Sequence, residues 1–318
     1  MRPSKSRGLF DHSTRLMTCS RLRTSGAALL LSLWALFLLA ALVMSWALNI
    51  DSRLKLSGSE NRILEAQAMA ASGAEVAMAP AIKLNSPNLQ GKFGPRQSYS
   101  VRITGEGGRL NINWLVAGEN PARIEILRRY LEVKGFDLNE RDHMIDCLLD
   151  WVDPNVGTHR LNGASDSEDY HPAHTLLTRI DELKKVKGWE DFTSAPGWDD
   201  ELTVNSTGPV DLAWAPRDVL RALPGFTDAM VERLLQLRAG PDGIDGTADD
   251  TIFKNIDEIR AALGLSPEQF RELSPFVSFK DSVLRVVSTG RSGDITRVIQ
   301  LVFRRAGITP QLITWKEF

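Results

Sequence analysis

The stretch from Arg23 to Trp46, RTSGAALLLSLWALFLLAALVMSW, decides how this chain is organised. From Ala27 to Ile50, 24 consecutive residues carry no charge. A helix rising ~1.5 Å per residue would span ~36 Å over this segment, enough to cross a ~30 Å hydrocarbon core. A cleaved secretory signal is the alternative, because Ser45-Trp46-Ala47 offers small residues at a signal-peptidase spacing, but the apolar part of such a signal is usually ~7–15 residues long. The length therefore predicts a membrane-spanning helix, 27–50.

Charge is distributed unevenly around this stretch. Arg21 and Arg23 lie on its N-terminal side, whereas the first charge beyond it is Asp51. Because positive residues stay on the cytoplasmic side of a membrane helix, residues 1–26 are predicted to be cytoplasmic and the body to be exported. Residues 1–26 carry six Lys or Arg and one Asp, a net +5; since the whole chain carries −2, the remainder carries −7. This negative charge disfavours a nucleic-acid partner for the body.

Length and cysteine usage set further bounds. A chain of 318 residues allows roughly two domains, and 43% hydrophobic with 25% charged residues is ordinary globular composition. Cys19 precedes the apolar stretch, so the body holds one thiol, Cys147, and an intrachain disulfide within it is excluded. Cys147 lies on the apolar face of a predicted helix, which indicates a core position.

The helical pattern continues beyond the membrane segment. No proline occurs between Gly26 and Pro80, so a single helix of ~50 residues or more is expected, with its distal half lying on a globular domain. The residues that form a small, apolar stripe along that distal half are Leu54, Ile63, Ala66, Met69, Ala70, Gly73, Ala74, Ala77 and Ala81.

These features together resemble the N-terminus of a type IV prepilin or pseudopilin: basic residues, then Gly26, Ala27 and an unbroken apolar helix that runs into an amphipathic one. The resemblance implies that prepilin peptidase cuts between Gly26 and Ala27, so that residues 1–26 form the leader. Most members carry Glu at the fifth mature position, whereas this chain has Leu31. Lack of that Glu is characteristic of the K minor pseudopilins of type II secretion, for which a place at the fibre tip is proposed.

Motifs further along the chain resemble the same K family in matching order. They are the segments GRLNIN (108–113), LDWVD (149–153), NGASDSEDY (162–170), TRIDELKKVKGW (178–189) and VNSTGPVDLAWAPRDVLRALPGFTDAMVERLLQLRAG (204–240). The similarity covers nearly the whole chain, and its order is more specific than any single motif.

Local patterns predict the elements of the body. The segment 97–113 alternates around Gly105-Glu106-Gly107-Gly108, which favours a β-hairpin. Helical periodicity marks 121–135 and 139–153, and three β-rich runs at 282–290, 294–305 and 311–318 close the chain. The expected fold class is α+β: a pseudopilin fold with a long N-terminal transmembrane helix and an antiparallel sheet. By the resemblance, an inserted all-α domain of the helix-hairpin-helix or SAM-like type, 115–278, interrupts an α+β domain formed by 51–114 and 279–318.

The segment Pro216 to Arg238 reads as helix, Leu-Pro-Gly-Phe hairpin and helix. Such hairpins can present backbone N–H groups to a phosphate, but Asp228 opens the second helix and would repel one. A packing role is therefore favoured, with leucine and valine core faces at Leu220, Leu223, Val231, Leu234, Leu235 and Leu237. A second helix pair follows at 255–279, with Asp257 and Ser266 as candidate N-caps.

Two acidic loops are candidate structural calcium sites, because Ca²⁺ takes 6–8 hard oxygen ligands on a flexible backbone. The loop 240–251 offers Asp242, Asp245, Asp249 and Asp250, and the loop 153–170 offers Asp153, Asn155, Asp166, Glu168 and Asp169. Solvated acidic turns are the alternative interpretation of both loops. His171 and His174 lie near the second loop but lack a third defined ligand for zinc, so an ordinary surface loop is expected there.

P-loop, GxSxG, HExxH and CxxC patterns do not occur in the sequence, which argues against a tethered enzyme. The resemblance implies a minor pseudopilin that works by assembly in the bacterial inner membrane, with its C-terminal domain in the periplasm. Its implied partners are the I and J minor pseudopilins, the major pseudopilin, prepilin peptidase and the inner-membrane assembly platform. A type IV pilus minor pilin and a membrane-anchored DNA-uptake protein are the alternative functions.

Overall fold

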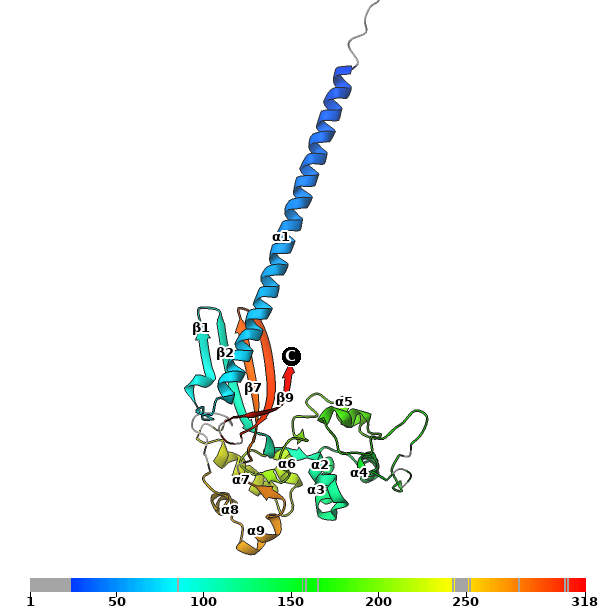
Figure 1. Cartoon of the computed structure of the whole chain (residues 1–318), viewed down its shortest axis with the longest axis vertical. Helices are drawn as coiled ribbons and strands as arrows, with labels where there is room; N and C mark the ends of the chain where they lie inside the picture. Colours follow the sequence, from blue (N-terminus) through cyan, green and yellow to red (C-terminus); the bar gives the residue numbers. More distant parts are fainter. Residues whose placement is uncertain are drawn as a thin grey trace, which may run out of the picture. The chain divides into compact units, whose positions relative to one another are not determined.

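The structure is a computed structural model that describes residues 24–84, 86–155, 157, 159–164, 166–241, 243, 251, 253–279, 281–305, 307 and 309–318. Its first element is the helix α1, Thr24–Met78, 55 residues long (Figure 1). This length confirms the prediction of one unbroken helix. The chain divides into two compact units, Met1–Asn61 and Arg62–Phe318, which are described separately.

In the first unit, the segment Ala27–Ile50 of α1 is long and apolar enough to cross a membrane, with a mean hydropathy of 2.6. None of this segment is buried against protein. An uncharged, largely apolar and uncovered helix surface is what a hydrocarbon environment favours. By length and composition, the helix fits a single-pass membrane anchor.

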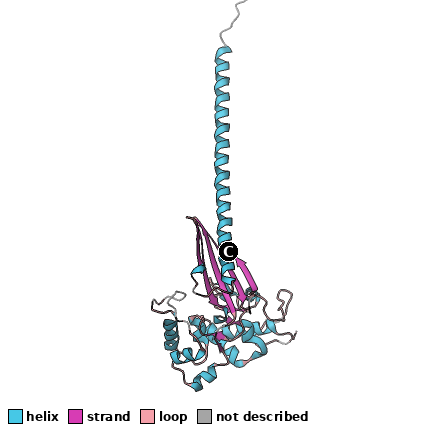
Figure 2. Cartoon of the chain, turned by 60° about the vertical axis from the view of Figure 1, so that its left-hand side comes forward, coloured by secondary structure: helices cyan, strands magenta, loops and turns pink. Residues whose placement is uncertain are grey.

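The second unit contains a five-stranded antiparallel sheet in the order β1-β2-β7-β8-β9. Figure 2 shows the strands in magenta. Its strands are β1 (Gln90–Phe93), β2 (Gln97–Gly105), β7 (Val283–Ser292), β8 (Ile295–Arg304) and β9 (Gln311–Glu317). The three β-rich runs predicted at the end of the chain are confirmed as β7, β8 and β9. The α+β fold class and its antiparallel sheet are confirmed as well.

The distal part of α1 packs closely on one face of this sheet. Ala66, Ala70, Ala74 and Ala77 are fully buried, as the small-residue stripe predicts. On β7, a Cβ at Gly290 would overlap the backbone of α1, and the Ser288 hydroxyl donates a hydrogen bond to a carbonyl of α1 at 2.6 Å. Small residues on both surfaces let the two backbones approach.

The stripe is shorter than predicted at its C-terminal end. Ala81 follows the end of α1 and is exposed, because the helix stops at Met78, ahead of Pro80. At the other end, the side chain of Leu54 lies outside the described residues.

The hairpin predicted over 97–113 is wrong. β2 pairs with β1 and β7, not with the residues that follow Gly105-Glu106-Gly107-Gly108. The chain instead passes through the 3-10 turn η2 (Glu106–Gly108) and the short strand β3 (Leu110–Asn111), which pairs in parallel with β4 (Leu202–Thr203). The alternating pattern could not reveal that Glu106 is buried and binds a distant residue of β7.

The chain between β2 and β7 forms a helical insert. Its helices are α2 (Ile112–Val116), α3 (Pro121–Val133), α4 (Leu138–Val152), α5 (Glu190–Ser194), α6 (Arg217–Ala222), α7 (Asp228–Arg238), α8 (Ile256–Leu263) and α9 (Pro267–Leu273). The short strands β5 (Val210–Asp211) and β6 (Val277–Ser278) pair in parallel. The insert and the sheet have separate hydrophobic cores: one draws on residues within 110–279, and the other on 69–103 and 284–303.

Helix caps fix several boundaries in the insert. Asp137 and Glu140 form a capping box at the start of α4, and Ser266 caps α9, as predicted. The cap of α8 is Asn255 rather than Asp257, which lies in the first turn. Aspartate is preferred as an N-cap, and it is also favourable in the first turn because its charge interacts with the helix dipole. The sequence therefore could not distinguish a cap at Asp257 from a first-turn position.

Candidate functional site

The insert is joined to the sheet by a buried carboxylate. Glu106, in η2, is fully buried. Its oxygens accept hydrogen bonds from Nε and Nη2 of Arg285 on β7, at 2.7 and 2.8 Å, and from the Thr203 hydroxyl of β4 at 2.5 Å. A bidentate guanidinium pair fixes both distance and orientation. One side chain thus ties the turn, the sheet and the insert together.

A second arginine completes this junction. Nη1 of Arg109 lies 3.3 Å from Glu106, and its Nε donates to the carbonyl of Asp200 at 2.7 Å. Burial lowers the pKa of Arg109, and the nearby charge of Arg285 lowers it further. The backbone approaches closely here as well, since a Cβ at Gly105 or Gly108 would overlap Trp214, so these positions require glycine.

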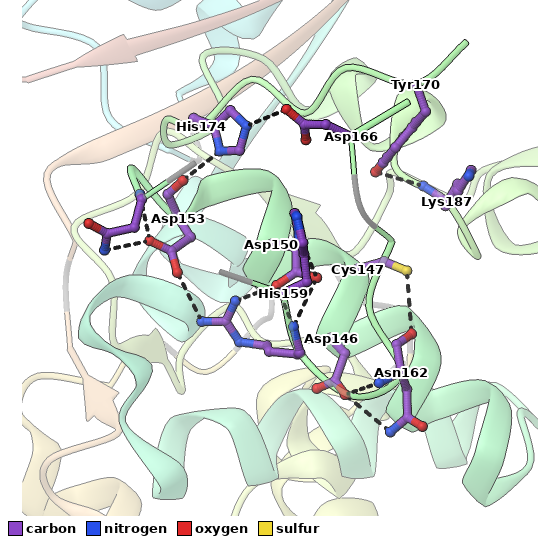
Figure 3. Close-up of polar contacts among 12 residues, drawn as sticks. Asp146, Cys147, Asp150, Asp153, His159, Asn162, Asp166, Tyr170, His174 and Lys187 are labelled. Atoms are coloured by element: carbon purple, nitrogen blue, oxygen red, sulfur yellow. Dashed lines mark hydrogen bonds and ion pairs between the residues drawn. The ribbon is translucent and has the colours of Figure 1, made fainter. Parts of the chain in front are cut away.

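The acidic loop after α4 is organised by ion pairs with arginine (Figure 3). Asp150 is buried at the C-terminal end of α4 and accepts a hydrogen bond from Nη1 of Arg160 at 2.6 Å and one from its backbone N–H at 3.2 Å. Arg160 also contacts Asp153 at 3.6 Å and pairs with Glu119. A Cβ at Gly163 would overlap the carboxylate of Asp150, which explains the glycine at this position.

Asp153 and Asp166 are linked through His174. The ring Nδ1 of His174 lies 2.8 Å from the carbonyl oxygen of Asp153, and Nε2 lies 3.4 Å from a carboxylate oxygen of Asp166. The first of these contacts is the main cause that raises the pKa of His174. Hydrogen bonds from the backbone and side-chain amides of Asn155 hold the carboxylate of Asp153 and lower its pKa.

The other predicted ligands in this loop do not converge with these residues. Glu168 and Asp169 are exposed, and within the described part of the chain no group of three or more His, Cys, Asp or Glu side chains could hold a metal ion. Arg160 occupies the position that a cation would need between Asp150 and Asp153. The described residues of this loop therefore do not fit a calcium site.

The aspartates of the other predicted calcium loop, 240–251, lie outside the described residues. Asp242, Asp245, Asp249 and Asp250 all fall there. His171, considered with His174 for zinc, is exposed, and no group of three or more possible metal ligands lies among the described residues. This is consistent with an ordinary surface loop.

Cys147 is a fully buried core residue, as predicted. Burial raises the pKa of its thiol to about 12, so the group is protonated at neutral pH. On the same helix, Asp146 accepts hydrogen bonds from the backbone and side chain of Asn162, and the carbonyl of Asn162 lies 2.6 Å from a ring nitrogen of His143. These contacts, which sequence reasoning missed, hold the loop on α4; the only sequence signal was the density of polar residues on one helix.

The helix-hairpin-helix predicted at 216–238 forms as α6 and α7. The N-cap of α7 is Thr227, and the positively charged groups near it are already paired: Arg221 with Asp228 at 2.8 Å, and Arg217 with Glu232. A phosphate at this hairpin would meet carboxylates, which favours packing over binding of DNA. The predicted core face holds except at Leu237, which is 42% exposed.

The predicted processing residues lie at the start of α1. Gly26 and Ala27 belong to its first turn, and Leu31, at the fifth position after the predicted cut, is 71% exposed. The side chain of Leu31 meets no polar group within the described residues. Its apolar character suits a helix surface in lipid, where a lone carboxylate would be costly.

A long N-terminal helix with its distal end on an antiparallel sheet, into which a helical domain is inserted, is a pseudopilin fold. The chain is similar to a chain in "The Crystal Structure of the GspK-GspI-GspJ complex from enterotoxigenic Escherichia coli Type 2 Secretion System". The TM-score is 0.57 at 12% identity, over 84% of this chain and 99% of the other. Residues 108–194 match the family described as "Type II secretion system (T2SS), protein K".

The family match over residues 108–194 and the shared fold confirm the resemblance to the K minor pseudopilins of type II secretion that the motifs carry. The matched region begins at η2 and ends in α5, so it contains the buried Glu106 junction only in part and the acidic loop in full. No curated protein sequence matches the chain.

Proposed function

We propose that this chain acts at the tip of a periplasmic pseudopilus, where it helps to initiate and cap the fibre that moves proteins across the outer membrane. The observation that carries the proposal is the insert between the adjacent strands β2 and β7, fixed to the sheet by Glu106 and Arg285. A head enlarged and held in this way would obstruct a subunit stacked above it. A subunit without a neighbour above it also has no amine to pair with a glutamate, which is consistent with Leu31.

The partners follow from the same proposal. The similar solved structure is a complex of GspK with GspI and GspJ, and we propose I-type and J-type minor pseudopilins as the direct partners of this chain. The major pseudopilin, prepilin peptidase and the inner-membrane assembly platform would act at successive stages. The apolar helix would anchor the chain in the inner membrane, with residues 1–26 in the cytoplasm and the C-terminal domain in the periplasm. The role is assembly rather than catalysis.

Processing of the N-terminus is the first test. The full chain is co-expressed with prepilin peptidase, and the mass of the mature protein is determined. A chain that starts at Ala27 supports the proposal, and Gly26→Val serves as the control that blocks the cut. A chain that starts at Leu48, after Ser45-Trp46-Ala47, indicates a signal peptidase instead, and an uncut wild-type chain contradicts the proposal.

The place at the tip needs a separate test. An antibody raised against the helical insert is applied to sheared pseudopili with gold detection. Label at one end of each fibre is expected, because the insert obstructs further stacking above this subunit. Label along the length of the fibres would contradict the capping role without affecting the family assignment.

We further propose that calcium is a structural ligand of the loop 240–251, on the strength of its four aspartates and its glycines. The variant Asp245→Asn/Asp249→Asn would reduce the calcium-dependent rise in melting temperature of the full chain. The control Asp166→Asn/Glu168→Gln removes two carboxylates from the loop that does not fit calcium and should preserve that rise. A wild-type chain whose melting temperature does not respond to calcium contradicts the proposal.

A further inference from the structure

The sheet has a second face, opposite α1, whose composition differs from the rest of the body. Successive side chains of a strand point to opposite faces, and Ser288 and Gly290 of β7 face α1. Arg291 and Thr289, which alternate with them, therefore point to the opposite face. The pairing register adds Lys92 and Ser98 in the row of Arg291, and Arg102 two rows further along.

Two cations of this second face are paired with carboxylates of the insert: Arg285 with Glu106 at 2.7 Å and Lys316 with Asp181 at 3.1 Å. The other cations of this face are unpaired within the described residues. The five strands contain a single Asp or Glu, Glu317, and Gln67 of α1 donates a hydrogen bond to it at 2.6 Å, which places Glu317 on the covered face. Lys92, Arg102 and Arg291 are exposed, and none has an ion-pair partner in the part of the chain that the structure describes.

Several arginines elsewhere in the body are paired, although Arg233 and Arg271 have no ion-pair partner among the described residues. Arg128, Arg160 and Arg217 each pair with carboxylates, even where water could solvate them. What distinguishes Lys92, Arg102 and Arg291 is that they share one face of the sheet, on a body whose formal charge is negative. Complementarity predicts an acidic surface opposite them.

Between the cations lies a floor of small and β-branched side chains. Ser100, Thr289 and Val298 form one row across the sheet, and Phe318 pairs with Val298 at its end through backbone hydrogen bonds of 2.9 and 3.2 Å. Phe318 is 65% exposed. We name the surface formed by Lys92, Ser100, Arg102, Arg291, Val298 and Phe318 the cationic face.

A rigid floor with an exposed aromatic ring and arginines at its margin has the composition of a protein interface, where aromatic residues and Arg are enriched. Lipid headgroups interact with cations as point charges and need no such floor. The apolar centre and the spread of the cations over three strands therefore favour a protein partner.

We propose that the cationic face binds an acidic surface of another protein subunit of the same fibre. The proposal rests on the proposed function only for the origin of that partner. The contact would be made by the sheet, and the insert would remain free for other contacts.

The test uses the full chain, solubilised in detergent and co-expressed with the I-type and J-type pseudopilins of the same system. The variant Arg102→Glu/Arg291→Glu reverses two charges on the cationic face. The control Arg233→Glu/Arg271→Glu makes the same change at exposed positions of α7 and α9 that have no ion pair among the described residues. We expect co-purification to fall at least about tenfold for the first variant and to be unchanged for the control.

Three outcomes separate the possibilities. Failure of the wild-type chain to co-purify contradicts the proposed function itself. Equal co-purification of wild type and both variants overturns the present inference alone, provided that the melting temperatures agree. Wild-type co-purification should also weaken from about 0.05 M to about 0.5 M NaCl, because salt screens exposed charges, and a salt-independent complex overturns the inference.

A labelling measurement distinguishes a lipid partner. In the variant Cys19→Ser/Ser100→Cys, the introduced thiol lies on the cationic face, while Cys147 is buried. Slower maleimide labelling in the presence of the partner pseudopilins is expected. Slower labelling in phosphatidylglycerol nanodiscs relative to phosphatidylcholine nanodiscs, with no effect of the partner subunits, would assign the face to lipid and overturn the inference.

Discussion

The buried pair of Glu106 and Arg285 gives the sharpest prediction about stability. The variant Arg285→Met keeps a long side chain on β7 but removes both guanidinium donors and the charge that balances the carboxylate. Glu106 is fully buried and would remain in place, because η2 and the adjacent strand ends enclose it. The variant therefore leaves a carboxylate without its main partner.

The expected loss of stability depends on the contacts that the Glu106 carboxylate keeps in this variant. Removing one partner of a buried ion pair typically costs ~3–5 kcal/mol. Arg109, at 3.3 Å, and the Thr203 hydroxyl, at 2.5 Å, still contact the carboxylate, so we expect a loss near ~3 kcal/mol. For a unit of this size, each kcal/mol changes the melting temperature by ~2–4 °C, which gives a decrease of ~6–12 °C. The double variant Glu106→Leu/Arg285→Met should recover part of it, because no buried carboxylate remains, although Arg109 loses its partner.

The assay is thermal unfolding of the full chain in detergent, followed by near-ultraviolet circular dichroism. Trp214 lies against Gly105 and Gly108 and so reports on the junction. Arg291→Met is the matched control on the same strand; since Arg291 is exposed and unpaired within the described residues, it should change stability by less than ~0.5 kcal/mol. A melting temperature for Arg285→Met within ~2 °C of wild type, or a double variant less stable than the single one, would refute the reasoning.

Three further predictions concern single residues. Gly290→Val should destabilise the packing of α1 by several kcal/mol, since its Cβ would overlap the helix backbone; an unchanged thermal transition would contradict this. His174 has a raised pKa, chiefly through the carbonyl of Asp153 and then through Asp166, so its charged ring should stabilise the loop below about pH 6.5 and lose this effect as pH rises through the folded value. NMR titration of the ring checks this, and Asp166→Asn should lower the measured pKa. Cys147, with a thiol pKa of about 12, should resist iodoacetamide in the folded chain and react after denaturation; rapid labelling of the native protein would contradict its burial.

Much of the fold could be predicted from local signals. The unbroken α1, the three C-terminal strands and the cap at Ser266 depend on periodicity, on the absence of proline and on capping residues, all of which act within a few residues. The family resemblance added the helical insert, because the order of motifs carries information that no single motif has.

The candidate site was less predictable. The acidic loop 153–170 looked suitable for calcium because its oxygen ligands are dense in sequence, but Arg160 folds back onto Asp150 and Asp153 and takes the place of a cation. Arg160, ten positions after Asp150, decides the electrostatics of this loop. The direction in which its side chain points cannot be predicted from sequence spacing alone. The same holds for His174, whose ring joins two loop residues.

The sequence by itself determined the membrane-spanning helix and the stripe of small residues, because each depends only on residue type and local period. Only the tertiary structure decided where β2 ends. Glu106 binds Arg285, 179 residues later, and that contact turns an alternating segment away from a hairpin and into the insert. The physical reason is that burying a carboxylate requires a specific partner, and the chain takes the path that supplies one.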